Sequence, residues 1–375
     1  TMQSNGKINE ESPQQPFELL LLTIERDLPV LSVGLPFIIQ FIIPQKIKII
    51  ASSSCIEKVK SLGLDRPFFD KSLNKASSDR SSFDNSLSDK SSDQCSIPVI
   101  EYLDEDTVVP GLSLAAVKHC IKAHGGNGDR AGWYFKQLLL LAYATQPSPY
   151  RYYLVWDTDT IPVRPLTFFD ETGRVLMTTK KELHATYFRT MEQLIGIGKV
   201  AHDSFIAEHM MFERPHVVRL LNCIMNHVSI NDSENDAHKE SCNEFFNTPL
   251  DAPKFFDAQK FIEAIIGAIK PEELDASGFS EYETYGSFMY HTARERIASR
   301  ELPSMRLGSS FFDRPPTTTQ LFALSRHYYW ASFEAWQSTS IKARITHRVR
   351  HIIGRLWTAG TVLLAPRAFA SWRDG

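Results

Sequence analysis

Two aspartates separated by one residue follow directly on an apolar run. The run from Tyr152 to Trp156 is aromatic and aliphatic, as a buried strand should be, and Asp157 and Asp159 come next. Side chains alternate between the faces of a strand, so this spacing predicts two carboxylates on one side at the strand's carboxyl end. Open α/β sheets bind ligands there, and carboxylate oxygens suit Mg²⁺ or Mn²⁺. The pattern predicts a metal-diphosphate site.

An Asp-x-Asp sequence alone is weak evidence for a metal site, because surface turns are rich in aspartate. Its setting makes this one more specific. A buried strand is expected before it, and the stretch 161–165 after it carries Pro162 and Pro165, which cannot continue the interior of a sheet. The combination favours a metal site at a strand end over a solvated turn.

The same aspartates admit a second chemistry. Residues 157–161 resemble the nucleophile motif of haloacid-dehalogenase-type phosphatases, in which Asp157 would form a phosphoenzyme. That motif normally opens its domain, whereas about 150 residues precede it here, and no later Asp-Asp cluster completes the site. The phosphatase is therefore the alternative interpretation.

The elements that must position these aspartates alternate between strands and helices. Apolar runs predict strands at 17–24, 46–51 and 99–103. Helices are expected at 28–42, which carries Pro29 and Pro36, and at 133–144, which is entered through a glycine-rich turn. This order is typical of an α/β fold with a mostly parallel sheet flanked by helices.

Four sequence blocks make the interpretation more specific. They are RAGWYFKQL at 130–138, WDTDTIP at 156–162, SFIAEHMMF at 204–212 and FSEYETYG at 279–286. In this order they resemble a little-characterised family of GT-A glycosyltransferase-like proteins. The resemblance covers 17–335 and implies a Rossmann-like GT-A domain. It implies the transfer of a sugar from a nucleotide-diphosphate sugar to a hydroxyl acceptor, with Mn²⁺ or Mg²⁺ as cofactor. It fixes neither the sugar nor the stereochemistry.

The resemblance assigns roles to the aspartates. In the GT-A pattern the second aspartate, Asp159, meets the metal ion, while Asp157 supports the ribose or a metal-bound water. GT-A enzymes often recruit a histidine from near the end of the domain as a third ligand. His291 and His327 are the candidates, and we take His291 because it follows the fourth block.

The first block supplies candidates for donor binding. Arg130 and Lys136 flank the start of a helix, where the helix N-terminus and cations favour anions such as phosphate, although a solvated helix end would look the same. Trp133 can stack on a base, but it can equally be core. Gln137 belongs to the same block. His209, in the third block, is expected in a partly buried strand position that contacts the donor sugar.

The fourth block contains two candidate general bases. Inverting transfer needs a carboxylate that takes the proton of the acceptor hydroxyl, and Glu281 or Glu283 would serve. In a strand the two would share a face. At a helix N-terminus capped by Ser280 they would instead compensate the helix dipole.

The last segment is basic and amphipathic. Residues 341–373 carry seven cationic side chains, Lys342, Arg344, Arg348, Arg350, Arg355, Arg367 and Arg373. Interleaved apolar residues at helical spacing predict a C-terminal helical extension. Such a helix either makes peripheral contact with an anionic membrane or docks on the catalytic domain with its basic face in water. Both alternatives remain open at this stage.

Length and composition fit a domain of this size. The chain has 375 residues, 43% of them hydrophobic, and a net charge of -3, so nothing suggests a nucleic-acid partner. We expect a disordered N-terminus at 1–16, a glycosyltransferase domain at 17–335 with a disordered insertion at 70–97, and the tail at 336–375. No run reaches the roughly 20 apolar residues of a membrane span, and five scattered cysteines indicate no zinc site.

Two further alternatives stay open. A nucleotidyltransferase would share the strand and helix order but would need an early glycine-rich phosphate loop, for which 32–35 is too short. A nucleotide- or carbohydrate-binding module would keep the pocket without turnover. The compartment is open between the cytosol and the lumen of the secretory pathway, with or without membrane association.

Overall fold

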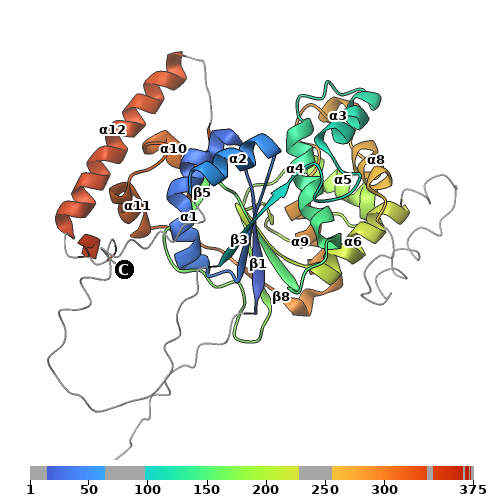
Figure 1. The fold of residues 1–375 in the computed structure, drawn as a ribbon, viewed down its shortest axis with the longest axis horizontal. Coiled ribbons are helices and arrows are strands. Elements are labelled where there is room, and N and C mark those ends of the chain that lie inside the picture. Colours follow the sequence, from blue (N-terminus) through green and yellow to red (C-terminus); the bar gives the residue numbers. More distant parts are fainter. Residues whose placement is uncertain are drawn as a thin grey trace, which may run out of the picture. The chain divides into compact units, whose positions relative to one another are not determined.

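The computed structural model describes residues 15–63, 98–227, 256–335, 341–365, 368–370 and 372. Its central feature is a five-stranded, mostly parallel sheet flanked by helices (Figure 1). The strand order is β3-β2-β1-β4-β7, with bounds Val99–Asp104, Lys46–Ala51, Phe17–Leu22, Tyr152–Trp156 and His209–Glu213. The predicted mixed α/β fold class with a C-terminal helical extension is confirmed.

The sheet is built from continuous apolar runs. Strands β1 and β4 read FELLLL and YYLVW and are buried along nearly their whole length, as strands covered on both faces must be. They pair in parallel, from Phe17 opposite Tyr152 to Leu20 opposite Val155. The chain leaves β1 for β2 and β3 and returns to β4 on the other side of β1. This reversal of strand order marks the carboxyl ends of β1 and β4 as the place where such sheets bind ligands.

The chain divides into two compact units. Unit 1 comprises Thr1–Leu20, Leu103–Trp156 and Thr167–Glu301. Its helices include α3 (Leu114–Ala123), α4 (Ala131–Ala142), α5 (Ala185–Ile195), α6 (Arg214–His227), α8 (Ala258–Gly267) and α9 (Glu281–Thr292). A two-stranded parallel sheet, β6 (Val175–Thr178) with β8 (Ile297–Arg300), also belongs to it.

Unit 2 comprises Leu21–Tyr102, Asp157–Leu166 and Leu302–Gly375. Its helices include α1 (Leu28–Ile42), α2 (Ser53–Ser61), α10 (Gly308–Phe311), α11 (Thr318–Ser325) and α12 (Ile341–Leu364). A small sheet of order β5-β10-β9 joins Thr160–Pro162, Trp330–Ser332 and Ser304–Met305. Among the described residues, no helix combines the length and hydrophobicity needed to cross a bilayer.

Several predicted elements agree closely with the structure. The helix at 28–42 and the strand at 46–51 have the predicted bounds, and α4 begins two residues before the predicted start. In the third block, His209 begins a strand, β7, as expected, while Ser204 makes only an isolated bridge to Lys180. The predicted insertion at 70–97 lies outside the described residues, as do 1–14 and 336–340.

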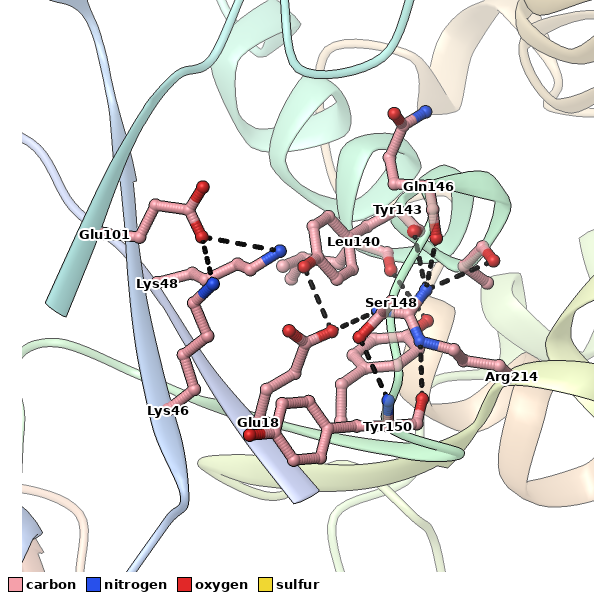
Figure 2. Close-up of polar contacts among 12 residues, drawn as sticks. Glu18, Lys46, Lys48, Glu101, Leu140, Tyr143, Gln146, Ser148, Tyr150 and Arg214 are labelled. Atoms are coloured by element: carbon pink, nitrogen blue, oxygen red, sulfur yellow. Dashed lines mark hydrogen bonds and ion pairs between the residues drawn. The ribbon is translucent and has the colours of Figure 1, made fainter. Parts of the chain in front are cut away.

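A buried ion pair holds part of unit 1 together (Figure 2). Arg214, at the start of α6, contacts the carboxylate of Glu18 in β1, and the Tyr143 hydroxyl donates to the same oxygen over 3.0 Å. The guanidinium also donates to the carbonyls of Tyr143, Ala144, Gln146 and Tyr150. Glu18 is 0% and Arg214 8% exposed, so these bonds replace the water that both charges lose.

Gly286, inside α9, permits a close approach of that helix to Phe205. A Cβ at position 286 would collide with the phenyl ring of Phe205, whereas a Cβ at Gly360 of α12 would meet nothing within 4 Å. We expect Gly286→Ala to lower the free energy of unfolding by about 1–3 kcal/mol. The matched Gly360→Ala should raise it by up to about 1 kcal/mol, because alanine favours helix. Urea denaturation measures both, and equal unfolding midpoints for the two variants would contradict this packing.

Candidate functional site

The two aspartates lie in a turn that follows β4. The strand ends at Trp156, and the Thr160 amide donates to the Asp157 carbonyl over 3.0 Å. The strand geometry from which we predicted Asp157 and Asp159 on one side is therefore wrong, because both residues lie in the turn after the strand. The physical reason is that Thr160 begins a new strand, β5, which pairs with β10 in the small sheet, so β4 does not continue through the aspartates. Both aspartates are half-buried.

Neighbouring groups of unit 2 fix this turn on two sides. The Thr158 hydroxyl donates to the Leu22 carbonyl over 3.3 Å, at the end of β1. The Phe333 amide donates to the Asp159 carbonyl over 2.7 Å. The hydroxyl groups of Thr160 and Ser332 are 2.7 Å apart. These hydrogen bonds fix the backbone of the turn that carries the two aspartates.

The start of α4 is fastened to the segment that precedes α9. The Arg130 guanidinium donates to the Ala276 carbonyl over 3.0 Å and to the Ser277 hydroxyl over 3.1 Å. It also lies 4.6 Å from the ring centre of Trp133, a cation–π distance. The Gly278 amide donates to the Tyr134 hydroxyl over 3.1 Å. Two segments more than 140 residues apart are thus held side by side.

Gln137 brings the first and fourth blocks into direct contact. Its Oε1 accepts a hydrogen bond from the Glu281 amide over 3.1 Å, and both side chains are buried. Four of the predicted site residues, Arg130, Trp133, Gln137 and Glu281, therefore converge in unit 1. Lys136 is half-buried on the same helix. The aspartate turn belongs to unit 2.

Glu281 and Glu283 lie in the first turn of a helix. The Ser280 hydroxyl caps α9 by accepting from the Glu283 amide over 3.3 Å. Of the two arrangements that the sequence left open, the structure has the capped helix. The two carboxyls are 5% and 1% exposed, unlike the solvated acids that usually occupy such positions. The helix dipole favours their negative charge.

Glu283 organises the chain before β7. Its Oε2 accepts from the Ser204 hydroxyl over 2.6 Å and from the Phe205 amide over 2.9 Å, and its Oε1 accepts from Ser287 over 3.1 Å. These bonds hold residues 204–205 against α9, which explains why the third block is not a strand throughout. A catalytic role for Glu283 stays a prediction.

Tyr187 of α5 was not predicted, yet it lies in the same cluster. Its ring stacks on Trp133 with 6.5 Å between centres. Burial raises the pKa of Tyr187, a hydrogen bond with Ser277 lowers it, the charge of Glu281 raises it and that of Arg130 lowers it. No sequence pattern marks this residue, because a tyrosine in an amphipathic helix is most simply a core residue.

His209 begins β7 and is 3% exposed. Its ring stacks on Trp156 with 4.9 Å between centres, and its Nε2 lies 3.1 Å from the Thr178 hydroxyl. Burial lowers the pKa of His209 well below 6.5, and the charges of Arg300 and Lys180 lower it further. The imidazole is therefore neutral at pH 7. Contact with a donor sugar stays a prediction for this residue.

His291 lies in the last turn of α9 and is exposed. Ten residues separate it from Glu281 along the same helix, or about 15 Å at 1.5 Å per residue. Within the described ranges, no three His, Cys, Asp or Glu side chains are grouped as metal ligands. The third-ligand assignment stays a prediction.

Two further cations of unit 1 are in ion pairs. Lys180 pairs with Glu208 over 3.8 Å, and Arg189 pairs with Glu273.

Comparison with solved structures finds chains of similar fold, whereas comparisons by sequence find no match. None of the family models matches the chain, and none of the curated proteins does. The solved structure of mouse xyloside xylosyltransferase 1 in its apo form is similar with a TM-score of 0.38 and 9% identity. The match covers 86% of this chain and 98% of the mouse chain.

The hydrogen bonds of Glu283 predict a structural effect of mutation. Glu283→Gln replaces one acceptor oxygen by a donor and leaves buried groups of Ser204, Phe205 or Ser287 unpaired. We expect the free energy of unfolding to fall by about 1–3 kcal/mol. Ser287→Ala, the control, should cost about 1 kcal/mol because it removes a single bond. Denaturant unfolding tests this, and a wild-type midpoint for Glu283→Gln would contradict the assigned role.

Burial of His209 predicts a stability that depends on pH. Its folded pKa lies below the unfolded value of 6.5, so the contribution is present above pH 6.5 and is lost as the pH falls. At one pH unit below 6.5, protonation of His209 in the unfolded chain alone should lower the free energy of unfolding by about 1.4 kcal/mol. His209→Gln, which retains a partner for Thr178, should weaken this dependence. His202→Gln should not, because that side chain is 97% exposed. Denaturant unfolding at two pH values measures this dependence. An identical change of stability with pH in the His209→Gln and His202→Gln variants would contradict the role of buried His209.

Proposed function

We propose that this protein is a metal-dependent GT-A-type glycosyltransferase. It would move a hexosyl or pentosyl group from a nucleotide-diphosphate sugar to a hydroxyl of a carbohydrate or glycoconjugate acceptor. The observation that carries the proposal is the position of Asp157 and Asp159. They are half-buried in a fixed turn directly after β4, the strand beside β1 at which the strand order reverses. Ligands of such sheets bind at this place.

The donor atoms at this turn fit a divalent cation. Two aspartate carboxylates supply the hard oxygens that Mg²⁺ and Mn²⁺ prefer, and Thr158 and Phe333 fix the backbone that presents them. Asp159 would be the principal ligand, with Asp157 beside it and His291 as the candidate third ligand. A bound ion would neutralise the charge of the diphosphate leaving group.

The cluster at the start of α4 supports donor binding. Arg130 and Lys136 supply positive charge near a helix N-terminus, which favours phosphate. Trp133 presents a half-buried ring for stacking, and Gln137 fixes the amide of Glu281. His209, stacked on Trp156 immediately before the aspartate turn, would bind the donor or position that turn.

Glu281 is the preferred general base. In an inverting reaction its carboxylate would take the proton of the acceptor hydroxyl as that oxygen attacks the anomeric carbon and the nucleoside diphosphate leaves. Glu281 is 5% exposed and lies at a helix N-terminus, whose dipole favours a negative charge. Glu283, whose oxygens bind Ser204, Phe205 and Ser287, would position this turn.

Nucleotide binding should depend on metal and on Asp159. In a thermal-shift screen of UDP, GDP, CDP and ADP with and without Mn²⁺, we expect one nucleotide to stabilise the wild type only when Mn²⁺ is present. At a hundredfold excess over Kd the gain is about 2.7 kcal/mol. Asp159→Ala should abolish the shift, because it removes the main metal ligand.

The control for this experiment is Glu295→Ala, which removes an exposed carboxylate from unit 1 and should keep the full shift. A nucleotide shift of equal size in Asp159→Ala would overturn the metal site. Phosphate-ester hydrolysis with phosphate trapped on Asp157 would instead establish the phosphatase. Metal-dependent binding without transfer to any acceptor would favour a binding module.

A further inference from the structure

One face of α12 is docked on unit 2. Gly354 faces the backbone of Phe311 so closely that a Cβ there would collide with its carbonyl oxygen. The Trp357 ring lies 5.9 Å from that of Phe312, and Thr358 is 7% exposed. The Arg350 guanidinium lies 5.6 Å from the ring centre of Phe311. Within unit 2, α12 therefore has a fixed rotation against α10 and α11 (Figure 1).

The other face of α12 carries an exposed apolar stripe. Its members are Val349, Ile352, Ile353, Leu356, Leu363 and Leu364, which are 51–89% exposed. The spacing of three, four, seven, fourteen and fifteen residues from Val349 places all six on one side of a helix. Six of the thirteen exposed large hydrophobic residues in the described part of the chain thus lie on this one stripe. Scattered exposed leucines are ordinary, but a continuous stripe of this kind marks an interaction surface.

The charge of α12 restricts what can cover the stripe. The helix sequence contains Lys342, Arg344, Arg348, Arg350 and Arg355 but no Asp or Glu, although the whole chain has a net charge of -3. Arg355 is 71% exposed and directly precedes Leu356 in the stripe. Its guanidinium pairs with Asp313 over 3.9 Å, and an ion pair as exposed as this one contributes little. Arg355 therefore places a positive charge beside the apolar stripe.

We propose that α12 binds the surface of an anionic lipid bilayer, with the stripe of Val349, Ile352, Ile353, Leu356, Leu363 and Leu364 inserted at the headgroup level. An anionic surface matches the cationic helix, and the apolar side chains enter the interface. A second copy of α12 fits less well, because arginines would face arginines across the contact with no acids on the helix to pair with them. Since the opposite face is packed on α10 and α11, the helix lies in the plane of the membrane.

The experiment is co-sedimentation of the full chain with vesicles of phosphatidylcholine and phosphatidylglycerol in equal parts. We expect wild-type protein to bind, and to bind less as salt is raised, since salt screens the arginines. Leu356→Asp should lower the binding constant about tenfold or more. It replaces an apolar group that the bilayer would bury with a charge that the anionic lipids repel. Leu183→Asp is the matched control, since Leu183 is 51% exposed in unit 1, and it should bind like wild type.

Three results would overturn the proposal. One is equal binding of Leu356→Asp and wild type, and another is equal binding to vesicles of pure phosphatidylcholine. The third is a concentration-dependent dimer in light scattering that Leu356→Asp dissociates, which would assign the stripe to a second copy of the chain. None of these measurements depends on sugar transfer, so they leave the proposed activity to its own test.

Discussion

The buried pair of Glu18 and Arg214 is the constraint on which much of unit 1 depends. Arg214 donates to four carbonyls between Tyr143 and Tyr150, the segment that links α4 to β4, while Glu18 anchors the guanidinium to β1. Loss of either partner would leave an uncompensated charge inside the protein. One guanidinium thus holds the segment between α4 and β4, and β4 is followed directly by the aspartate turn.

A second polar arrangement joins α4 to α9. The bonds from Arg130, Tyr134 and Gln137 all reach the short segment between Ala276 and Glu281, so the start of α9 is held by side chains of another helix. Glu283, in the first turn of α9, in turn holds Ser204 and Phe205 by hydrogen bonds. The chemistry proposed for Glu281 depends on this arrangement, because a base acts only when its carboxylate is held in place.

The aspartate turn lies where the chain passes from one sheet to another. β4 belongs to the five-stranded sheet, whereas β5 starts at Thr160 and pairs with β10. Between them the chain must turn within Asp157–Asp159, and hydrogen bonds from Thr158 and Phe333 hold that turn. These bonds fix the backbone that carries both aspartates, on which the proposed metal site depends.

Local patterns in the sequence determined the elements. The apolar runs and their breaks gave the bounds of α1 and β2, the position of β4 and the mixed α/β class, because periodicity and helix-breaking residues act over a few neighbours. They also gave the tail helix and its cationic character. The sequence marked Asp157, Asp159 and Glu281 as candidates by residue type and order alone.

Only the tertiary structure decided which of these residues meet. The contact between Gln137 and Glu281 joins positions 144 residues apart, and the cluster includes Tyr187, which no local pattern marked. It also decided that the aspartates lie in a turn, that Ser204 is held by Glu283, and that one stripe of α12 is exposed. The physical reason is that hydrogen-bond partners and burial are set by packing between distant segments, whereas a sequence pattern reports only on near neighbours.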